Sequence, residues 1–159
     1  MERYRFLIVD DDQQIRGMLQ QFFTKLGYIV MTAETGKDGL EKFMEHTFDC
    51  VISDLVMPDM DGLALLKRVK ERSPKTLFFL ITGYGTIENA VQGIKEGAND
   101  FITKPFQLED MKIRVERALR SKNLEKSVKK MTGMLWAVII SIPLWLILGI
   151  VLGIVWKRF

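Results

Sequence analysis

Short apolar runs alternate along most of the chain with longer segments in which apolar positions recur at helical spacing. Such runs are typical of buried parallel strands, and the longer segments are typical of amphipathic helices. The runs predict strands near residues 4–9, 28–33, 49–54, 76–82 and 99–103, and the segments between them predict helices near 13–26, 36–46, 61–72, 86–97 and from 107 onward. The alternation therefore predicts an α/β fold with a five-stranded, doubly wound parallel sheet.

Acidic residues end two of the predicted strands. Asp10 and Asp11 follow the run Phe6–Val9, and Asp54 follows the run Cys50–Ser53. Because the carboxyl ends of parallel strands meet at one edge of a sheet, the three carboxylates are expected to share one pocket. Such a cluster is costly unless a cation neutralises it, and all-oxygen ligands suit Mg²⁺. A carboxylate beside the bound ion can accept a phosphoryl group.

Two further strand ends supply a hydroxyl and an ammonium group. The fourth predicted strand ends in Thr82, which Gly83 follows, and the fifth is followed by Lys104. Hydroxyl and ammonium groups are the donors that phosphoryl oxygens need, and a glycine beside them leaves space for the phosphate. The predicted pocket therefore holds the groups for phosphoryl transfer.

The acids, the threonine and the lysine occur in the order and spacing of a known family. Over about residues 3–121 the chain resembles the receiver domain of two-component response regulators, and the stretch 83–91 resembles receivers of the nitrogen-regulation type. The resemblance implies a flavodoxin-like receiver fold with Asp54 as the phosphoacceptor. It also implies that Asp11, Asp54 and the backbone carbonyl of Val56 contact Mg²⁺ directly, and that Asp10 acts through water.

The same resemblance assigns the groups that respond to phosphorylation. Lys104 is expected to pair with the phosphoryl oxygens, aimed by a cis bond to Pro105. Thr82 is expected to move toward the phosphoryl group, and Phe101 stands where the family places its switch aromatic, although a plain core aromatic remains open. The surface of the fourth helix, fifth strand and fifth helix then repacks. By the same resemblance, Val56 and Tyr84 are expected to flank the phosphoryl site.

The implied activity is signalling rather than turnover of an outside substrate. The expected donor is the phosphohistidine of a histidine kinase or a phosphotransfer protein, and the chain would catalyse only its own phosphorylation and dephosphorylation. Two alternatives stay open: a phosphorylation-independent membrane adaptor, and a phosphate sink that competes for a kinase.

The residues after the receiver-like part have a different composition. Residues 134–156 carry no charge, and 14 of these 23 residues are Leu, Ile or Val. As a helix this segment would be about 35 Å long, enough to cross a hydrocarbon core of about 30 Å. We therefore predict a receiver domain at 1–121, a basic and helical juxtamembrane linker at 122–133, a transmembrane helix at 134–156 and a short basic tail at 157–159.

Charge predicts the orientation of this segment. Residues 1–119 hold 16 basic and 19 acidic residues, whereas residues 120–159 hold 7 basic and 1 acidic, so the tail produces the chain's net charge of +3. Five of the tail's basic residues precede the apolar segment. Segments rich in Lys and Arg beside a membrane helix tend to stay on the cytoplasmic side. This bias predicts a single-pass protein of the inner (cytoplasmic) membrane with its receiver in the cytoplasm. The basic residues are expected to meet anionic lipid, and no nucleic-acid partner is expected.

Two features leave a homodimer open. Gly149 and Gly153 have the spacing of a helix-pairing motif in membranes. The spacing of a short coiled-coil seam also occurs at Leu124, Val128, Met131 and Leu135, although a solvated helix stays open there. A membrane-protein target of the receiver face is the other partner that the predicted location brings within reach.

Overall fold

The computed structural model describes residues 4–83, 87–124 and 157, and it divides the chain into two compact units, Met1–Leu119 and Arg120–Phe159. In the first unit, strands and helices alternate as the apolar pattern predicts. They are β1 (Arg5–Val9), α1 (Gln13–Lys25), β2 (Ile29–Ala33), α2 (Gly36–Glu45), β3 (Cys50–Asp54), α3 (Gly62–Arg72), β4 (Leu77–Thr82), α4 (Ile87–Lys95) and β5 (Asp100–Thr103). A further helix covers residues 108–124.

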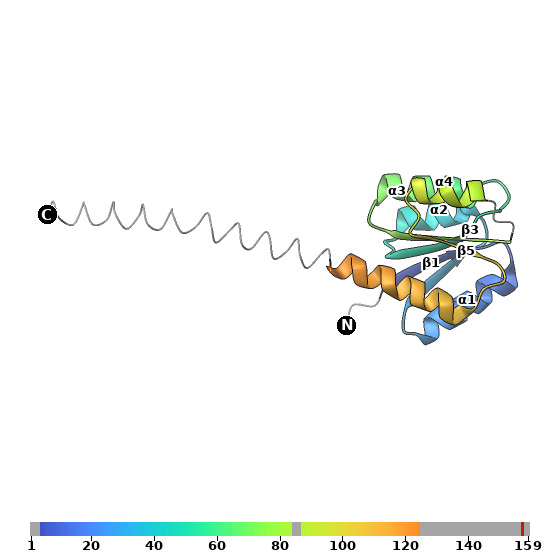
Figure 1. The fold of residues 1–159 in the computed structure, drawn as a ribbon, viewed down its shortest axis with the longest axis horizontal. Coiled ribbons are helices and arrows are strands. Elements are labelled where there is room, and N and C mark those ends of the chain that lie inside the picture. Colours follow the sequence, from blue (N-terminus) through green and yellow to red (C-terminus); the bar gives the residue numbers. More distant parts are fainter. Residues whose placement is uncertain (1–3, 84–86, 125–156, 158–159) are drawn as a thin grey trace. The chain divides into compact units, whose positions relative to one another are not determined.

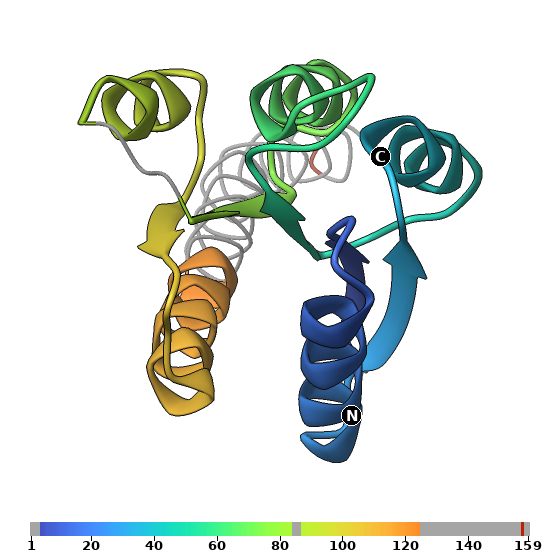
Figure 2. The same cartoon turned by 90° about the vertical axis from the view of Figure 1, so that its right-hand side faces the viewer.

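The five strands form one parallel sheet in the order β2-β1-β3-β4-β5, which confirms the predicted fold class. Helices α2, α3 and α4 cover one face, and α1 and the helix over residues 108–124 cover the other (Figures 1 and 2). The order changes direction at β1, where the connection to β2 goes one way and the connection to β3 the other. Ligands of doubly wound sheets bind beside such a switch point, at the carboxyl ends of the strands.

Alternation along β1 explains why both faces of the sheet are apolar. Leu7 and Val9 pack with residues of α2 and α3, whereas Phe6 and Ile8 pack with residues of α1 and the helix over 108–124. Both sets are fully buried. Successive side chains of a strand point to opposite faces, so a continuous apolar run is what a strand covered on both sides requires.

The ends of α1 are set by local chemistry. Asp12 caps the helix, and its carboxylate accepts the N–H groups of Gln14 and Ile15 at 2.8 and 3.3 Å. Beyond the last turn, Gly27 has a φ of 91°, a conformation that costs glycine nothing. The cap fixes the start of α1 directly after the acidic end of β1, so the first turn of the helix borders the pocket.

Gly62, the first residue of α3, lets the helix approach the end of β3. A Cβ added to Gly62 would overlap the carbonyl oxygen of Asp54 and lie 2.9 Å from Leu55 Cα. Neither backbone atom can move without displacing Asp54. Replacing Gly62 with Ala should therefore lower the free energy of unfolding by about 2–3 kcal/mol, as measured by urea denaturation.

Gly17 in α1 is the matched control for this change. A Cβ at Gly17 meets nothing within 4 Å. The Gly17→Ala substitution should raise the free energy of unfolding by about 0.5–1 kcal/mol, because alanine restricts the unfolded chain and favours the helix. Equal destabilisation by both substitutions would contradict the overlap at Asp54.

Several sequence predictions concern residues outside the described ranges. They include Tyr84, the transmembrane segment 134–156 and most of the linker over 122–133. In the part of the chain that the structure describes, no helix is both long enough and apolar enough to cross a membrane.

Candidate functional site

Three carboxylates meet where β1 and β3 end. Asp10 directly follows β1, and Asp54 is the last residue of β3; the parallel register pairs Val9 with Ser53 and so brings the two ends together. Asp10 and Asp54 are 1% and 7% exposed, whereas Asp11 faces solvent. Oxygens of the three carboxylates lie within 4.8 Å of one another. The structure thus brings together the acids that the sequence placed at strand ends.

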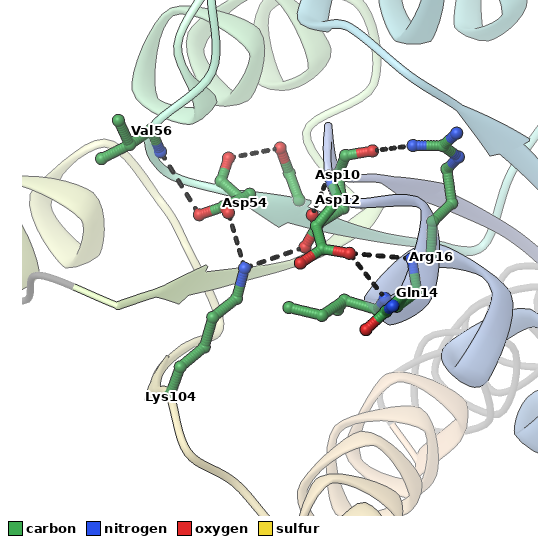
Figure 3. A network of polar contacts seen from close by, with 9 residues as sticks. Asp10, Asp12, Gln14, Arg16, Asp54, Val56 and Lys104 are labelled. Carbon is green, nitrogen blue, oxygen red and sulfur yellow. Dashed lines mark hydrogen bonds and ion pairs between the residues drawn. The ribbon is translucent and has the colours of Figure 1, made fainter.

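Lys104 connects the two buried acids. Its Nζ lies 2.6 Å from Asp54 Oδ2 and 3.1 Å from Asp10 Oδ2 (Figure 3). The lysine follows β5, its N–H donates to the carbonyl of Thr82 at 2.7 Å, and its peptide bond to Pro105 is cis. The side chain is 19% exposed, so its ammonium group reaches the acids from the rim of the pocket.

Backbone N–H groups complete the environment of the carboxylates. Asp10 Oδ1 accepts the N–H of Asp12 at 2.9 Å, and Asp54 Oδ1 accepts the N–H of Val56 at 3.3 Å (Figure 3). Val56 thus donates to one oxygen of Asp54, and Lys104 donates to the other. The backbone of Val56 lies next to the cluster, and its side chain is exposed at the rim.

Thr82 and Phe101 lie on the neighbouring strands. Thr82 ends β4 one residue beyond Ile81, which pairs with Asp54, so the threonine stands beside the end of β3. It is fully buried. Phe101 of β5 pairs with Leu80 and is partly buried against the core between the sheet and α2–α3. The order Asp54, Thr82, Lys104 therefore crosses the sheet edge from β3 to β5.

Burial and the ion pairs shift the pKa values of Asp10 and Lys104 in opposite directions. Burial raises the pKa of Asp10, and the Asp12 N–H and the Lys104 ammonium offset only part of that rise. Burial also acts to lower the pKa of Lys104, but hydrogen bonds to Asp54 and Asp10 outweigh it and leave this pKa raised. Lys104 therefore stays charged, and Asp10 is the acid that the metal-free pocket stabilises poorly.

The raised pKa of Asp10 gives a stability prediction. The folded protein holds this proton more tightly than the unfolded chain, so stability is lost as the pH rises from 3.8, the ordinary pKa, through the folded pKa. The Asp10→Asn variant should therefore raise the metal-free unfolding free energy at pH 7 by about 1–2 kcal/mol. The gain should shrink as the pH falls toward 3.8. Urea denaturation across this range measures both, and a loss of stability at pH 7 would contradict the assignment.

The donor set fits Mg²⁺. Its candidate ligands are carboxylate oxygens, two of them from buried residues and one from a residue open to solvent. Hard divalent cations prefer such oxygens, and Mg²⁺ keeps several waters, for which the exposed side of Asp11 leaves access. The single ammonium group of Lys104 cannot balance three carboxylates. The cluster is therefore a candidate Mg²⁺ site.

Sequence reasoning did not single out Arg16. Its Nη1 donates to the main-chain carbonyl of Asp10 at 2.5 Å, and its side chain is 15% exposed. The acceptor is a backbone oxygen, which leaves no trace in residue type or spacing. An arginine five residues after paired acids reads from sequence as an ordinary helix surface residue.

Comparisons with known proteins agree with this geometry. Residues 6–116 match the family model described as the response regulator receiver domain. The DNA-binding transcriptional regulator NtrC of Escherichia coli is 38% identical over 119 residues, 75% of this chain and 25% of that protein. The regulatory protein AtoC of Escherichia coli is 35% identical over 125 residues, 79% of this chain and 27% of that protein. The chain thus spans about a quarter of the length of these relatives.

Solved structures show the same fold. A CheY-like response regulator receiver domain protein from Methanospirillum hungatei aligns with a TM-score of 0.76 and 32% identity, over 78% of this chain and 99% of that chain. NtrX from Brucella abortus aligns with a TM-score of 0.75 and 32% identity, over 80% of this chain and 30% of that chain. The alignments extend to proteins made of little else than this domain and to larger ones that contain it.

Proposed function

Because the chain belongs to the response regulator receiver family, we propose that it accepts a phosphoryl group on Asp54 from the phosphohistidine of a histidine kinase or phosphotransfer protein. The observation that carries this proposal is the position of Asp54. Its carboxylate lies within 4.8 Å of two other carboxylates and 2.6 Å from the Lys104 ammonium. One pocket thus holds a nucleophile, a fixed cation and a donor set for Mg²⁺.

The transfer needs little from the protein beyond position and charge. An oxygen of Asp54 attacks phosphorus, the P–N bond to the donor imidazole breaks, and the imidazole keeps the electron pair of that bond. Lys104 can follow the phosphoryl oxygens because it already contacts Asp54 Oδ2. Bound Mg²⁺ would neutralise further charge on the phosphoryl oxygens. Water later cleaves the acyl phosphate to carboxylate and inorganic phosphate.

Phosphorylation would act on the adjoining strands. The phosphoryl group adds nearly two negative charges and strong acceptors at the end of β3. Thr82 ends the next strand, and its hydroxyl is the group that would turn toward these acceptors. The space left behind Thr82 would admit Phe101, which is only partly buried. The face formed by α4, β5 and the helix over residues 108–124 would then change shape and signal to a membrane-proximal partner.

The membrane anchor is the second part of the proposal. It rests on the uncharged segment 134–156 and on the basic residues that precede it. In the sequence, the helix over residues 108–124 lies between the receiver strands and that segment. A receiver anchored at the cytoplasmic face of the inner membrane would find both its kinase and a membrane-protein target within reach.

Phosphoryl uptake in vitro tests the first part. Residues 1–130 would be incubated with acetyl phosphate, with Mg²⁺ or with EDTA, and uptake would be followed by intact mass. One phosphoryl group per chain is expected with Mg²⁺ and none with EDTA. A beryllofluoride mimic should shift the NMR resonances of Thr82 and Phe101 under the same Mg²⁺ requirement. Absence of uptake and of any Mg²⁺-dependent shift would refute the phosphoacceptor proposal and favour the adaptor.

A further inference from the structure

Arg16 binds the backbone of the acidic pocket rather than its carboxylates. The residue lies early in α1, whose start is fixed by the Asp12 cap. Its guanidinium Nη1 donates to the carbonyl oxygen of Asp10 at 2.5 Å (Figure 3). A charged donor strengthens this bond, and the mostly buried side chain limits competition from water. A rigid helix thus holds one peptide group at the end of β1.

That peptide group joins Asp10 to Asp11. Asp10 is fixed at its other polar groups, because its N–H donates to the Ala33 carbonyl at 3.3 Å and its carboxylate accepts from Asp12 and Lys104. Asp11 differs: among the residues that the structure describes, none donates a hydrogen bond to its carboxylate. The direction of the Asp11 side chain therefore depends on the peptide plane that precedes it, and Arg16 holds the oxygen of that plane.

We propose that Arg16 is a positioning residue for the cation site, which it serves by fixing the Asp10–Asp11 peptide and thereby the direction of the Asp11 carboxylate. The inference rests on the proposed function, since the site it serves is the Mg²⁺ site of the phosphoacceptor. Partners that orient metal ligands in this way typically contribute 10- to 100-fold to metal affinity. Arg16 touches neither the ion nor the phosphoryl group in this role.

A second contact of Arg16 is too weak to explain its placement. Nη2 lies 3.9 Å from Glu34 Oε2, and the Glu34 side chain is 71% exposed. Exposed ion pairs at this separation contribute little. Glu34 therefore offers a matched control, because the Glu34→Gln variant removes the ion pair and leaves the bond from Arg16 to the Asp10 carbonyl intact.

Mg²⁺ affinity of the full-length chain in mild detergent tests the role of Arg16. Isothermal titration calorimetry would compare the parent chain with Arg16→Met, Arg16→Lys and Glu34→Gln. We expect the Kd for Mg²⁺ to rise about 10-fold in Arg16→Met, to recover part of the loss in Arg16→Lys, which keeps a charged donor, and to stay within about twofold in Glu34→Gln. Selective ¹⁵N-aspartate labelling should show the amide resonances of Asp11 and Asp12 shifting in Arg16→Met before any metal is added.

The outcomes distinguish a failure of this inference from a failure of the phosphoacceptor proposal on which it rests. If the parent chain binds Mg²⁺ and Arg16→Met binds it within about twofold, the positioning role is wrong and the phosphoacceptor proposal stands. An equal loss in Glu34→Gln would also overturn the role, because it would assign the effect to the ion pair. If the parent chain binds no Mg²⁺, the phosphoacceptor proposal fails and this inference falls with it. Circular dichroism would check folding, and Arg16→Gln replaces Arg16→Met under the same criteria if the latter does not fold.

Discussion

The Asp54→Asn variant should take up no phosphoryl group under conditions that phosphorylate the parent chain fully. An amide nitrogen is not nucleophilic, and the amide removes the negative charge that balances Lys104 at 2.6 Å. Asparagine has nearly the size of aspartate, and its oxygen can still accept from Lys104 or from the Val56 N–H. The fold should therefore survive while the reaction is lost. Intact mass after incubation with acetyl phosphate and Mg²⁺ measures the loss.

Asp59 provides the matched control for this experiment. It lies in the loop between β3 and α3 and has a φ of 66°, a left-handed conformation that asparagine tolerates as well as aspartate. It is not one of the three clustered acids. The Asp59→Asn variant should keep normal uptake. Uptake that persists in Asp54→Asn would move the acceptor to Asp10 or Asp11, and equal loss in both variants would indicate a distorted loop.

The Asp54→Asn variant also distinguishes a phosphorylation-dependent switch from an adaptor. A switch whose output depends on phosphorylation loses that output in Asp54→Asn, whereas an adaptor that only docks a partner keeps it. The comparison requires that the variant reach the membrane in normal amount, which immunoblotting of membrane fractions measures. An unchanged phenotype at equal abundance would exclude the switch and leave the adaptor.

The fold was predictable because each strand is a short apolar run, whereas each helix repeats its apolar positions at helical spacing. Both signals are local, and parallel pairing then carries the strand ends to one edge. The meeting of Asp10 and Asp54 follows from that topology alone, since both residues come at the carboxyl ends of adjacent strands. Lys104 follows for the same reason from β5. Residues at strand ends are thus the part of a site that sequence reasoning can reach.

The contacts of the backbone were not predictable in this way. Arg16 donates to a main-chain oxygen, and Gly62 leaves space for another, the carbonyl of Asp54. Both oxygens belong to the main chain, so no pattern of side chains in the sequence indicates these contacts. The direct bonds of Asp10 to Lys104 and the Asp12 N–H depend on burial that only the folded chain defines. The expectation that Asp10 acts through water at the metal stays a prediction.

Removing the residues after Lys130 should release the protein from membranes. The 23 residues over 134–156 hold 14 of the strongly apolar types and no charge, and at about 0.4 kcal/mol each these 14 favour insertion by roughly 6 kcal/mol. The receiver unit ends before this segment. The shortened chain should therefore stay in the supernatant after ultracentrifugation, keep its Mg²⁺-dependent phosphorylation and melt as the parent receiver does.

A point change in the full-length chain distinguishes loss of insertion from loss of residues. Leu146→Arg places a charge near the middle of the segment at a cost of about 3 kcal/mol, whereas Leu146→Phe keeps the segment apolar. Alkaline carbonate extraction should free more of the arginine variant than of the phenylalanine variant or the parent chain. If the chain cut after Lys130 still pelleted with membranes, the receiver unit or its basic helix would hold the protein there, and the anchor proposed for residues 134–156 would be wrong.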